Sequence, residues 1–194
     1  MTADDIATLL SQVSLASSPP PYEATPSDIS SSSPGGTAYA VYVGRQPGVY
    51  TTWPECLRQV KATSHNSYKA FDSLVLARRA YSAAAERGLV STSEARAADT
   101  RRVIERQQMV LEDLPLCLAF LEDPTSKAMA VGSSRFYVVY TGLQPGVYLT
   151  YHECSYLTSG YKGARHCSFY TKEEAVDALK RELVARKVYK LVLQ

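Results

Sequence analysis

The sequence is short of the features that define several large classes of protein. No apolar run approaches the roughly 18 residues that a membrane-spanning helix needs. No Lys or Arg precedes Arg45, so neither a secretory signal nor an Arg-rich transit peptide is predicted. The four cysteines include no C-x-x-C pair, which argues against a disulfide scaffold. We therefore expect a cytoplasmic or nuclear protein that makes no membrane contact.

Signatures of catalysis and of metal binding are also missing. The sequence has no nucleophile elbow, no phosphate-cradling glycine loop and no run of metal ligands. His152, Cys154, His166 and Cys167 lie near one another, but their spacing fits no common zinc pattern. The sequence thus predicts neither a cofactor nor a metal site.

What the sequence does contain is one segment that occurs twice. Residues 39–56 read YAVYVGRQPGVYTTWPEC and residues 137–154 read YVVYTGLQPGVYLTYHEC, and they are identical at twelve of eighteen positions at an offset of 98. The same offset carries Phe71 onto Phe169 and Ala77 onto Ala175, so the repeating unit has about 45 residues. The chain therefore contains two copies of one small domain.

Charge follows the same division. Residues 39–81 contain six bases and two acids, and residues 135–194 contain nine bases and five acids. Residues 1–38 and 82–134 are acidic on balance, so the net charge of +2 conceals two basic repeats. This pattern suits two modules that face a polyanion, although an ordinary mixed surface would give the same counts.

Each repeat begins with the pattern of a β-hairpin. In repeat one, residues 39–43 are rich in β-branched and aromatic side chains, as strands are. Gln46-Pro47-Gly48-Val49 predicts a type II turn, because Pro fixes φ and Gly accepts a positive φ. A second strand is expected over residues 49–52.

A helix, a strand and a second helix should follow. Thr52-x-x-Glu55 has the form of a capping box and predicts a helix over residues 53–61. A third strand is expected over residues 68–71, and Ser73 should cap a helix that runs towards Gly88. Repeat two has the same order, with capping boxes at Thr150-x-x-Glu153 and Thr171-x-x-Glu174 and a last helix from residue 172 to about 187.

The segment between the repeats is expected to be helical. Ser91-x-x-Glu94 can start a helix, and apolar residues follow at spacings of three, four and seven: Val103, Ile104, Val110, Leu111 and Leu114. We favour a helix that packs on the repeats over a dimerising helix, because the periodic stretch is too short for a coiled coil. The oligomeric state stays open.

The expected fold class is α+β, with two small domains that each combine a three-stranded antiparallel sheet and two helices in the order β-β-α-β-α. The expected divisions are a disordered tail (1–37), domain 1 (38–88), a helical linker (89–134), domain 2 (135–188) and a C-terminal tail (189–194).

Repeat one resembles a known family. Its pattern Y-A-V-x-x-G-R-x-P-G-V-Y-x-T-W-x-E-C, followed by Y-K-x-F, is similar to the N-terminal hybrid-binding domain of eukaryotic ribonucleases H, which also occurs in caulimovirus viroplasmin. Repeat two matches the first block well and the second block less well. The resemblance implies a small α+β domain that binds RNA/DNA hybrids, and double-stranded RNA more weakly, without reading sequence.

The resemblance also implies roles for particular residues. In the family an aromatic pair and adjacent lysines grip the DNA strand, and these positions correspond here to Trp53, Tyr68 and Lys69. Ala70 stands where the family often has a second lysine. The residue chemistry agrees, since aromatic faces stack on nucleotides and cations such as Lys69 and Arg45 neutralise phosphates. Tyr39 is a further candidate, with ordinary cross-strand packing as its alternative role.

Repeat two keeps the scaffold and changes these positions. Trp53, Arg45, Tyr68 and Lys69 of repeat one are matched in repeat two by Tyr151, Leu143, His166 and Cys167. Tyr151 together with Lys162 and Arg165 is therefore expected to form a weaker nucleic-acid surface. The alternative is that repeat two has become a packing or protein-binding module.

The expected function is non-catalytic. A ribonuclease H needs a carboxylate cluster that holds two divalent metals in a larger α/β domain, and this sequence shows no such cluster. We therefore expect sequence-tolerant binding of RNA/DNA hybrid or double-stranded RNA through repeat one, with repeat two altered. The alternative of a different class is a protein-interaction or assembly module, whose partner would be another protein.

Overall fold

Both repeats fold in the order that their sequences predict, and each adds one further strand. The computed structural model describes residues 36–102 and 104–194. Except for Gly36 and Thr37, the tail expected over 1–37 lies outside the described residues, as does Val103. Repeat one consists of β1 (Ala38–Gly44), β2 (Gly48–Tyr50), α2 (Trp53–Val60), β3 (Ser67–Phe71), α3 (Leu74–Glu86) and β4 (Ser91–Thr92). Repeat two consists of β6 (Phe136–Gly142), β7 (Gly146–Tyr148), α7 (Tyr151–Thr158), β8 (Arg165–Phe169), α8 (Lys172–Val184) and β9 (Val188–Leu193).

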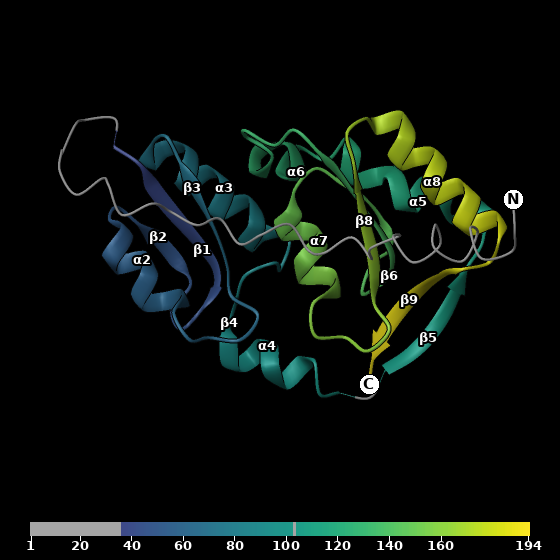
Figure 1. Ribbon diagram of the computed structural model, residues 1–194, viewed down its shortest axis with the longest axis horizontal. Coiled ribbons are helices and arrows are strands. Elements are labelled where there is room, and N and C mark those ends of the chain that lie inside the picture. Colours follow the sequence, from purple (N-terminus) through teal and green to yellow (C-terminus); the bar gives the residue numbers. More distant parts are fainter. Residues whose placement is uncertain (1–35, 103) are drawn as a thin grey trace, which may run out of the picture. The chain divides into compact units, whose positions relative to one another are not determined.

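The first strand is the centre of the sheet in each repeat (Figure 1). β1 pairs antiparallel with β2 and with β3, so that Tyr39 lies opposite Tyr50 and Ala40 lies opposite Lys69. β6 pairs in the same way with β7 and β8. The β-branched and aromatic side chains of these strands favour such pairing. The α+β fold class expected from the sequence is confirmed.

The further strand runs parallel to the end of the central strand. In repeat one Val43 of β1 lies opposite Ser91 of β4, and in repeat two Thr141 of β6 lies opposite Tyr189 of β9. Ser91 and Tyr189 are 98 residues apart, which is the offset of the duplication. The repeat therefore extends further than its sequence identity shows, and residues 189–193 are a strand rather than the expected C-terminal tail.

The linker is not the helix that its periodicity predicts. Residues Ile104–Met109 form a strand, β5, that pairs antiparallel with β9 along its whole length. Short helical segments flank it: α4 (Ser93–Asp99), η1 (Leu111–Asp113), α5 (Leu114–Leu118), η2 (Ala119–Leu121) and α6 (Pro124–Met129). The helix begins one residue later than expected: Thr92, and not Ser91, is the N-cap of α4. Pairing with a distant strand overrides the local pattern.

The expected type II turn is also absent. Gly48 already belongs to β2 and pairs with Val41, so it does not adopt the positive φ that this turn requires. The glycine that the hairpin does require is Gly44. A Cβ at this position would lie 2.9 Å from the carbonyl oxygen of Gln59 and 2.8 Å from Val41. Gly142 is confined in the same way by Leu157, so both glycines let the end of a helix approach the central strand.

The two helices of each repeat cover opposite faces of its sheet. On one face of β1, Val41 packs against Cys56 and Val60 of α2. On the other face, Ala38, Ala40 and Phe71 pack against the small side chains of α3: Ala77, Ala80, Ala83 and Ala84. In repeat two the corresponding helices are α7 and α8. Alternate residues of a strand point to opposite faces. Successive side chains of β3 and of β8 therefore also face first one helix and then the other.

The helix caps follow the sequence closely. Ser73 caps α3, and the capping boxes of Thr150 with Glu153 and of Thr171 with Glu174 are confirmed. In α2 the hydroxyl of Thr52 accepts from the backbone N–H of Glu55 at 3.4 Å, which is half of the expected box.

The helix α7 joins the two repeats in one core. The apolar cluster that contains β1 and α3 also contains Cys154 and Leu157 of α7. His152 stacks on Tyr42 of β1, with ring centroids 3.9 Å apart. The described residues all fall within one compact unit, Ser33–Gln194, so the repeats share a hydrophobic core.

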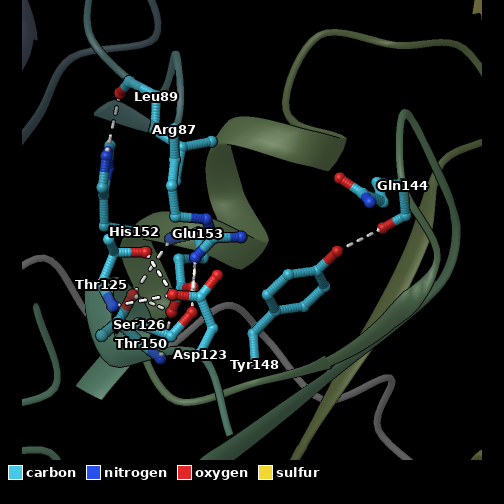
Figure 2. A network of polar contacts seen from close by, with 10 residues as sticks. All are labelled: Arg87, Leu89, Asp123, Thr125, Ser126, Gln144, Tyr148, Thr150, His152 and Glu153. Atoms are coloured by element: carbon cyan, nitrogen blue, oxygen red, sulfur yellow. Dashed lines mark hydrogen bonds and ion pairs between the residues drawn. The ribbon is translucent and has the colours of Figure 1, made fainter. Parts of the chain in front are cut away.

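A buried ion pair lies where the repeats meet (Figure 2). The carboxylate of Glu153 in α7 is fully buried and pairs with Arg87, which directly follows α3. Ser126 of α6 donates to the same oxygen at 2.7 Å, and the other oxygen accepts from the hydroxyl of Thr150 at 2.8 Å. A buried carboxylate is tolerated only with such partners. Glu153 thus connects repeat one, the linker and repeat two.

In residues 36–102 and 104–194, no helix combines the length and the apolar character that crossing a membrane requires.

The ion pair gives a direct stability prediction. Arg87→Ala leaves the Glu153 carboxylate buried without its cation, so the free energy of unfolding should fall by about 3 to 5 kcal/mol. Urea unfolding measures this loss.

Two variants serve as controls. Arg78→Ala, at an exposed position of α3, should change stability by about 0.5 kcal/mol or less. Adding Glu153→Gln to Arg87→Ala removes the stranded charge and should restore part of the loss. Equal effects of Arg87→Ala and Arg78→Ala would contradict the proposed role of the pair.

Candidate nucleic-acid interface

Three aromatic rings of repeat one form a cluster on the α2 face of the sheet. Trp53, the first residue of α2, lies between Tyr39 of β1 and Tyr68 of β3. The ring centroids of Tyr39 and Trp53 are 5.6 Å apart, and those of Trp53 and Tyr68 are 5.7 Å apart. All three side chains are half-buried. The indole is packed against the sheet and is still partly open to solvent, as a stacking surface requires.

Lys69 does not belong to this cluster. Tyr68 pairs with Val41 on the α2 face, whereas Lys69 pairs with Ala40 and lies on the α3 face. Its ammonium donates to the carbonyl of Val131 at 2.5 Å and lies 5.2 Å from the centre of the Phe71 ring. The sequence expectation that Trp53 and Lys69 form one grip is therefore not met. The reason is the alternation of side chains along β3.

Arg45 lies in the loop that follows β1, and its side chain is exposed. Its guanidinium donates to the carbonyl of Arg58 in α2 at 2.8 Å, while its backbone N–H donates to Gln59 at 2.9 Å. These contacts place a cation on the same helix that carries Trp53. A guanidinium with one nitrogen engaged still has further N–H groups that can bind a phosphate.

Repeat two contains a second aromatic cluster in the same place. Tyr151 of α7 lies between Tyr137 of β6 and His166 of β8. The centroid distances are 5.7 Å and 6.4 Å, close to those of the first cluster. Tyr151 is more open than Trp53, with 41% of its surface exposed. The aromatic scaffold therefore survives in repeat two, with His166 in the place of Tyr68.

The two cations expected to serve this second cluster lie elsewhere. Arg165 pairs with Glu182 of α8 and stacks over Tyr140 at 4.6 Å, so it faces away from Tyr151. Lys162 is exposed in the loop before β8, and its carbonyl accepts from Arg106 at 3.3 Å. Tyr151 lines a pocket, described below, and neither Arg165 nor Lys162 is among the residues that line it. Arg165 is thus not placed beside Tyr151, and its charge is paired with a carboxylate of α8.

The pocket lies between the two repeats and has a volume of about 410 Å³. Repeat one contributes Tyr42 and the β3 residues Ser67, Tyr68 and Lys69, and repeat two contributes Tyr137 and the start of α7. The segment 132–135, which includes Arg135, forms a further part of its lining. Sequence reasoning missed Tyr137 and Arg135 as site residues. The repeat register could have found Tyr137, which is the counterpart of Tyr39, but no pattern marks Arg135.

One wall of the pocket is fixed by His152. Its Nε2 must donate to the carbonyl of Leu89 at 3.0 Å, because that oxygen can only accept. In the neutral ring, Nδ1 then accepts from the hydroxyl of Ser67 at 2.8 Å. Burial lowers the pKa of His152 to about 3, and the nearby cations Arg87 and Arg96 act in the same direction. In the described part of the chain, no three His, Cys, Asp or Glu side chains come together as a metal site.

The comparisons with known proteins agree with this geometry. A family described as the Ribonuclease H1 N-terminal domain matches residues 37–81 and again residues 135–179. The chain carries two tandem copies of this domain. The resemblance drawn from the sequence is thereby confirmed, and each copy of the ribonuclease H1 N-terminal domain contains one of the aromatic clusters.

A curated relative matches a smaller part of the chain. A ribonuclease H of Crithidia fasciculata is 52% identical to it over 40 residues, which are 21% of this chain and 8% of that protein. The aligned part is thus less than a tenth of the relative's length. No solved structure matches the chain.

The buried histidine predicts a pH dependence of stability. Because the pKa of His152 is about 3 in the folded chain and near 6.5 when unfolded, the unfolded state binds more protons between these values. Stability should therefore fall as the pH drops below about 6.5, by at most about 1.4 kcal/mol per pH unit from this group.

The variant His152→Gln isolates the effect, since an amide keeps hydrogen bonds but does not titrate. Urea unfolding between pH 7 and pH 4 should give a flatter dependence for the variant than for the parent chain. Parallel curves would show that the pKa of His152 is the same in the folded and the unfolded chain, which would contradict the account.

Proposed function

We propose that the chain is a non-catalytic nucleic-acid-binding protein that binds RNA/DNA hybrid or double-stranded RNA through repeat one without reading base sequence. The observation that carries the proposal is the aromatic cluster of Trp53, Tyr39 and Tyr68, with ring centroids 5.6 and 5.7 Å apart. It occurs in a copy of a domain that is otherwise found at the N-terminus of ribonuclease H1. Such a role fits a cytoplasmic or nuclear protein.

The chemistry of the cluster supports binding without sequence readout. Aromatic faces stack on any sugar or base, because every base has a π-face. Arg45, which contacts the last turn of α2, supplies charge for a phosphate, which carries no sequence information. Together these groups recognise a backbone and a stacked surface rather than the edge of a particular base.

The second repeat would strengthen such binding. When one repeat is bound, the other is held at a high local concentration near the same duplex. The shared core of the repeats removes the freedom that a flexible linker would have. We propose that repeat two adds affinity in this way, through an altered surface.

Catalysis by this chain is not part of the proposal. The family matches cover only the N-terminal domain of ribonuclease H1, and no match to its catalytic domain accompanies them. This agrees with a binding role.

A protein-interaction module is the second candidate. It is favoured by exposed apolar side chains in and next to repeat two: Val131 at 38%, Tyr151 at 41% and Tyr170 at 71%. Rings and aliphatic groups of this kind are common at protein interfaces. The two candidates differ in whether bare nucleic acid binds.

The first candidate is tested by titrating the chain with RNA/DNA hybrid, double-stranded RNA and double-stranded DNA at two salt concentrations. We expect saturable binding of hybrid or double-stranded RNA that weakens as salt rises, because phosphate contacts release counterions. Trp53→Ala should weaken binding by about 1 to 3 kcal/mol, whereas Trp53→Phe keeps a stacking face and should lose less.

Circular dichroism and urea unfolding of both variants show whether the fold is intact. The proposal fails if the parent chain binds none of the three duplexes, and that result favours the protein-interaction candidate. It also fails if folded Trp53→Ala binds as tightly as the parent.

A further inference from the structure

Repeat two has kept its aromatic cluster, and Leu143 stands where repeat one has Arg45. Cys167, the counterpart of Lys69, pairs with Val138 on the α8 face and so lies on the other side of the sheet from this cluster. Arg165 is neutralised by Glu182 on the far side of the sheet. By itself, repeat two would offer stacking faces with Arg135 as its one cation in the lining of the pocket between the repeats.

Repeat one supplies a cation at this place. Lys69 and the aromatic residues Tyr137 and Tyr151 line the same pocket between the repeats. Arg135, whose counterpart in repeat one is Thr37, lines it too. Of the two cations beside the second cluster, Lys69 therefore belongs to repeat one, and Arg135 is the first residue of the stretch of repeat two that matches the family.

The pocket is suited to an anion. Its lining contains Lys69 and Arg135 and no Asp or Glu. Neither cation has a carboxylate partner among residues 36–102 and 104–194. Arg135 instead donates to the hydroxyls of Ser168 at 3.2 Å and Tyr170 at 2.7 Å. Two uncompensated positive charges in one hollow attract a phosphate.

The ammonium of Lys69 can still bind a phosphate in the pocket. Its ammonium donates to the carbonyls of Val131 at 2.5 Å and Met129 at 3.5 Å, at the end of α6. An ammonium has three N–H groups, so one remains for a ligand. Partial burial lowers the pKa of Lys69, which means that its charge is incompletely solvated. An anion in the pocket would replace the missing solvation.

We propose that the two repeats together build one composite nucleic-acid site, in which Tyr137 and Tyr151 of repeat two stack on a nucleotide and Lys69 of repeat one, with Arg135, binds its phosphate. The site rests on the proposed nucleic-acid binding and adds a contact that neither repeat makes alone. It also assigns Lys69 to the second aromatic cluster instead of the first.

The same bound strand can reach both clusters. Tyr68 belongs to the first cluster, through its contact with Trp53, and it also lines the pocket. Because β3 is an edge strand, it presents Tyr68 from one face and Lys69 from the other. The edge of β3 thus connects Trp53 to Tyr151 across the pocket. The occupant that fits this path is a nucleic-acid backbone with stacked nucleotides.

The test compares Lys69→Gln, Tyr151→Ala and Trp53→Ala in titrations with the duplex that the parent chain binds best. We expect Tyr151→Ala to weaken binding about 5- to 150-fold, since it removes a stacking face. Lys69→Gln should weaken binding and lower the salt dependence by about one phosphate contact. The amide of Gln can still donate to Val131, so the segment that closes the pocket should remain in place.

Matched controls separate the pocket from general effects. Tyr151→Phe keeps the ring and should lose less binding than Tyr151→Ala. Lys190→Gln removes an exposed cation of β9 outside the pocket and should bind like the parent chain. In the double variant the effects of Lys69→Gln and Tyr151→Ala should not add, because the two side chains would hold one nucleotide.

The outcomes distinguish the two levels of the account. If the parent chain binds no duplex, the proposed function fails and the composite site fails with it. If the parent binds and Trp53→Ala weakens it, but folded Lys69→Gln or Tyr151→Ala binds as tightly as the parent, nucleic-acid binding stands and the composite site is overturned. Additive effects in the double variant also overturn it, since they indicate separate contacts.

Discussion

The carboxylate of Glu153 is buried completely, and its charge is neutralised by Arg87. This pair is the constraint on which the arrangement of the repeats depends. Glu153 caps α7 of repeat two, Arg87 ends the helix α3 of repeat one, and Ser126 brings in the linker. Since a buried charge without its partner is strongly destabilising, the pair favours a single packing of the repeats. That packing creates the pocket in which side chains of both repeats meet.

Duplication has given the two copies the same scaffold and different surfaces. Gly44 and Gly142 are confined by helix ends in the same way, and both aromatic clusters keep nearly the same ring distances. The cations near the clusters differ between the two copies. The structure brings Lys69 of repeat one to the pocket that Tyr151 of repeat two lines. Two modules that share a core can thus divide the parts of one site between them.

The local features of the fold could be predicted from the sequence because they depend on neighbouring residues. The caps at Ser73, Thr150 and Thr171 follow from hydroxyl and carboxylate spacing. The strand β5 could not be predicted, since its pairing with β9 joins segments some eighty residues apart. Alternation along β3 does indicate that Tyr68 and Lys69 face opposite sides. The pocket that Lys69 lines also needs residues of the second repeat, so it can be seen only in the folded chain.

The central claim is that both repeats present one continuous surface to nucleic acid. The most direct measurement is the change in backbone amide chemical shifts when a labelled chain binds an RNA/DNA hybrid. The account predicts shifts that begin around Trp53, follow β3 through Lys69, and continue into residues 132–135 and the start of α7. Shifts confined to α2 and β3, with the start of α7 unchanged, would contradict it.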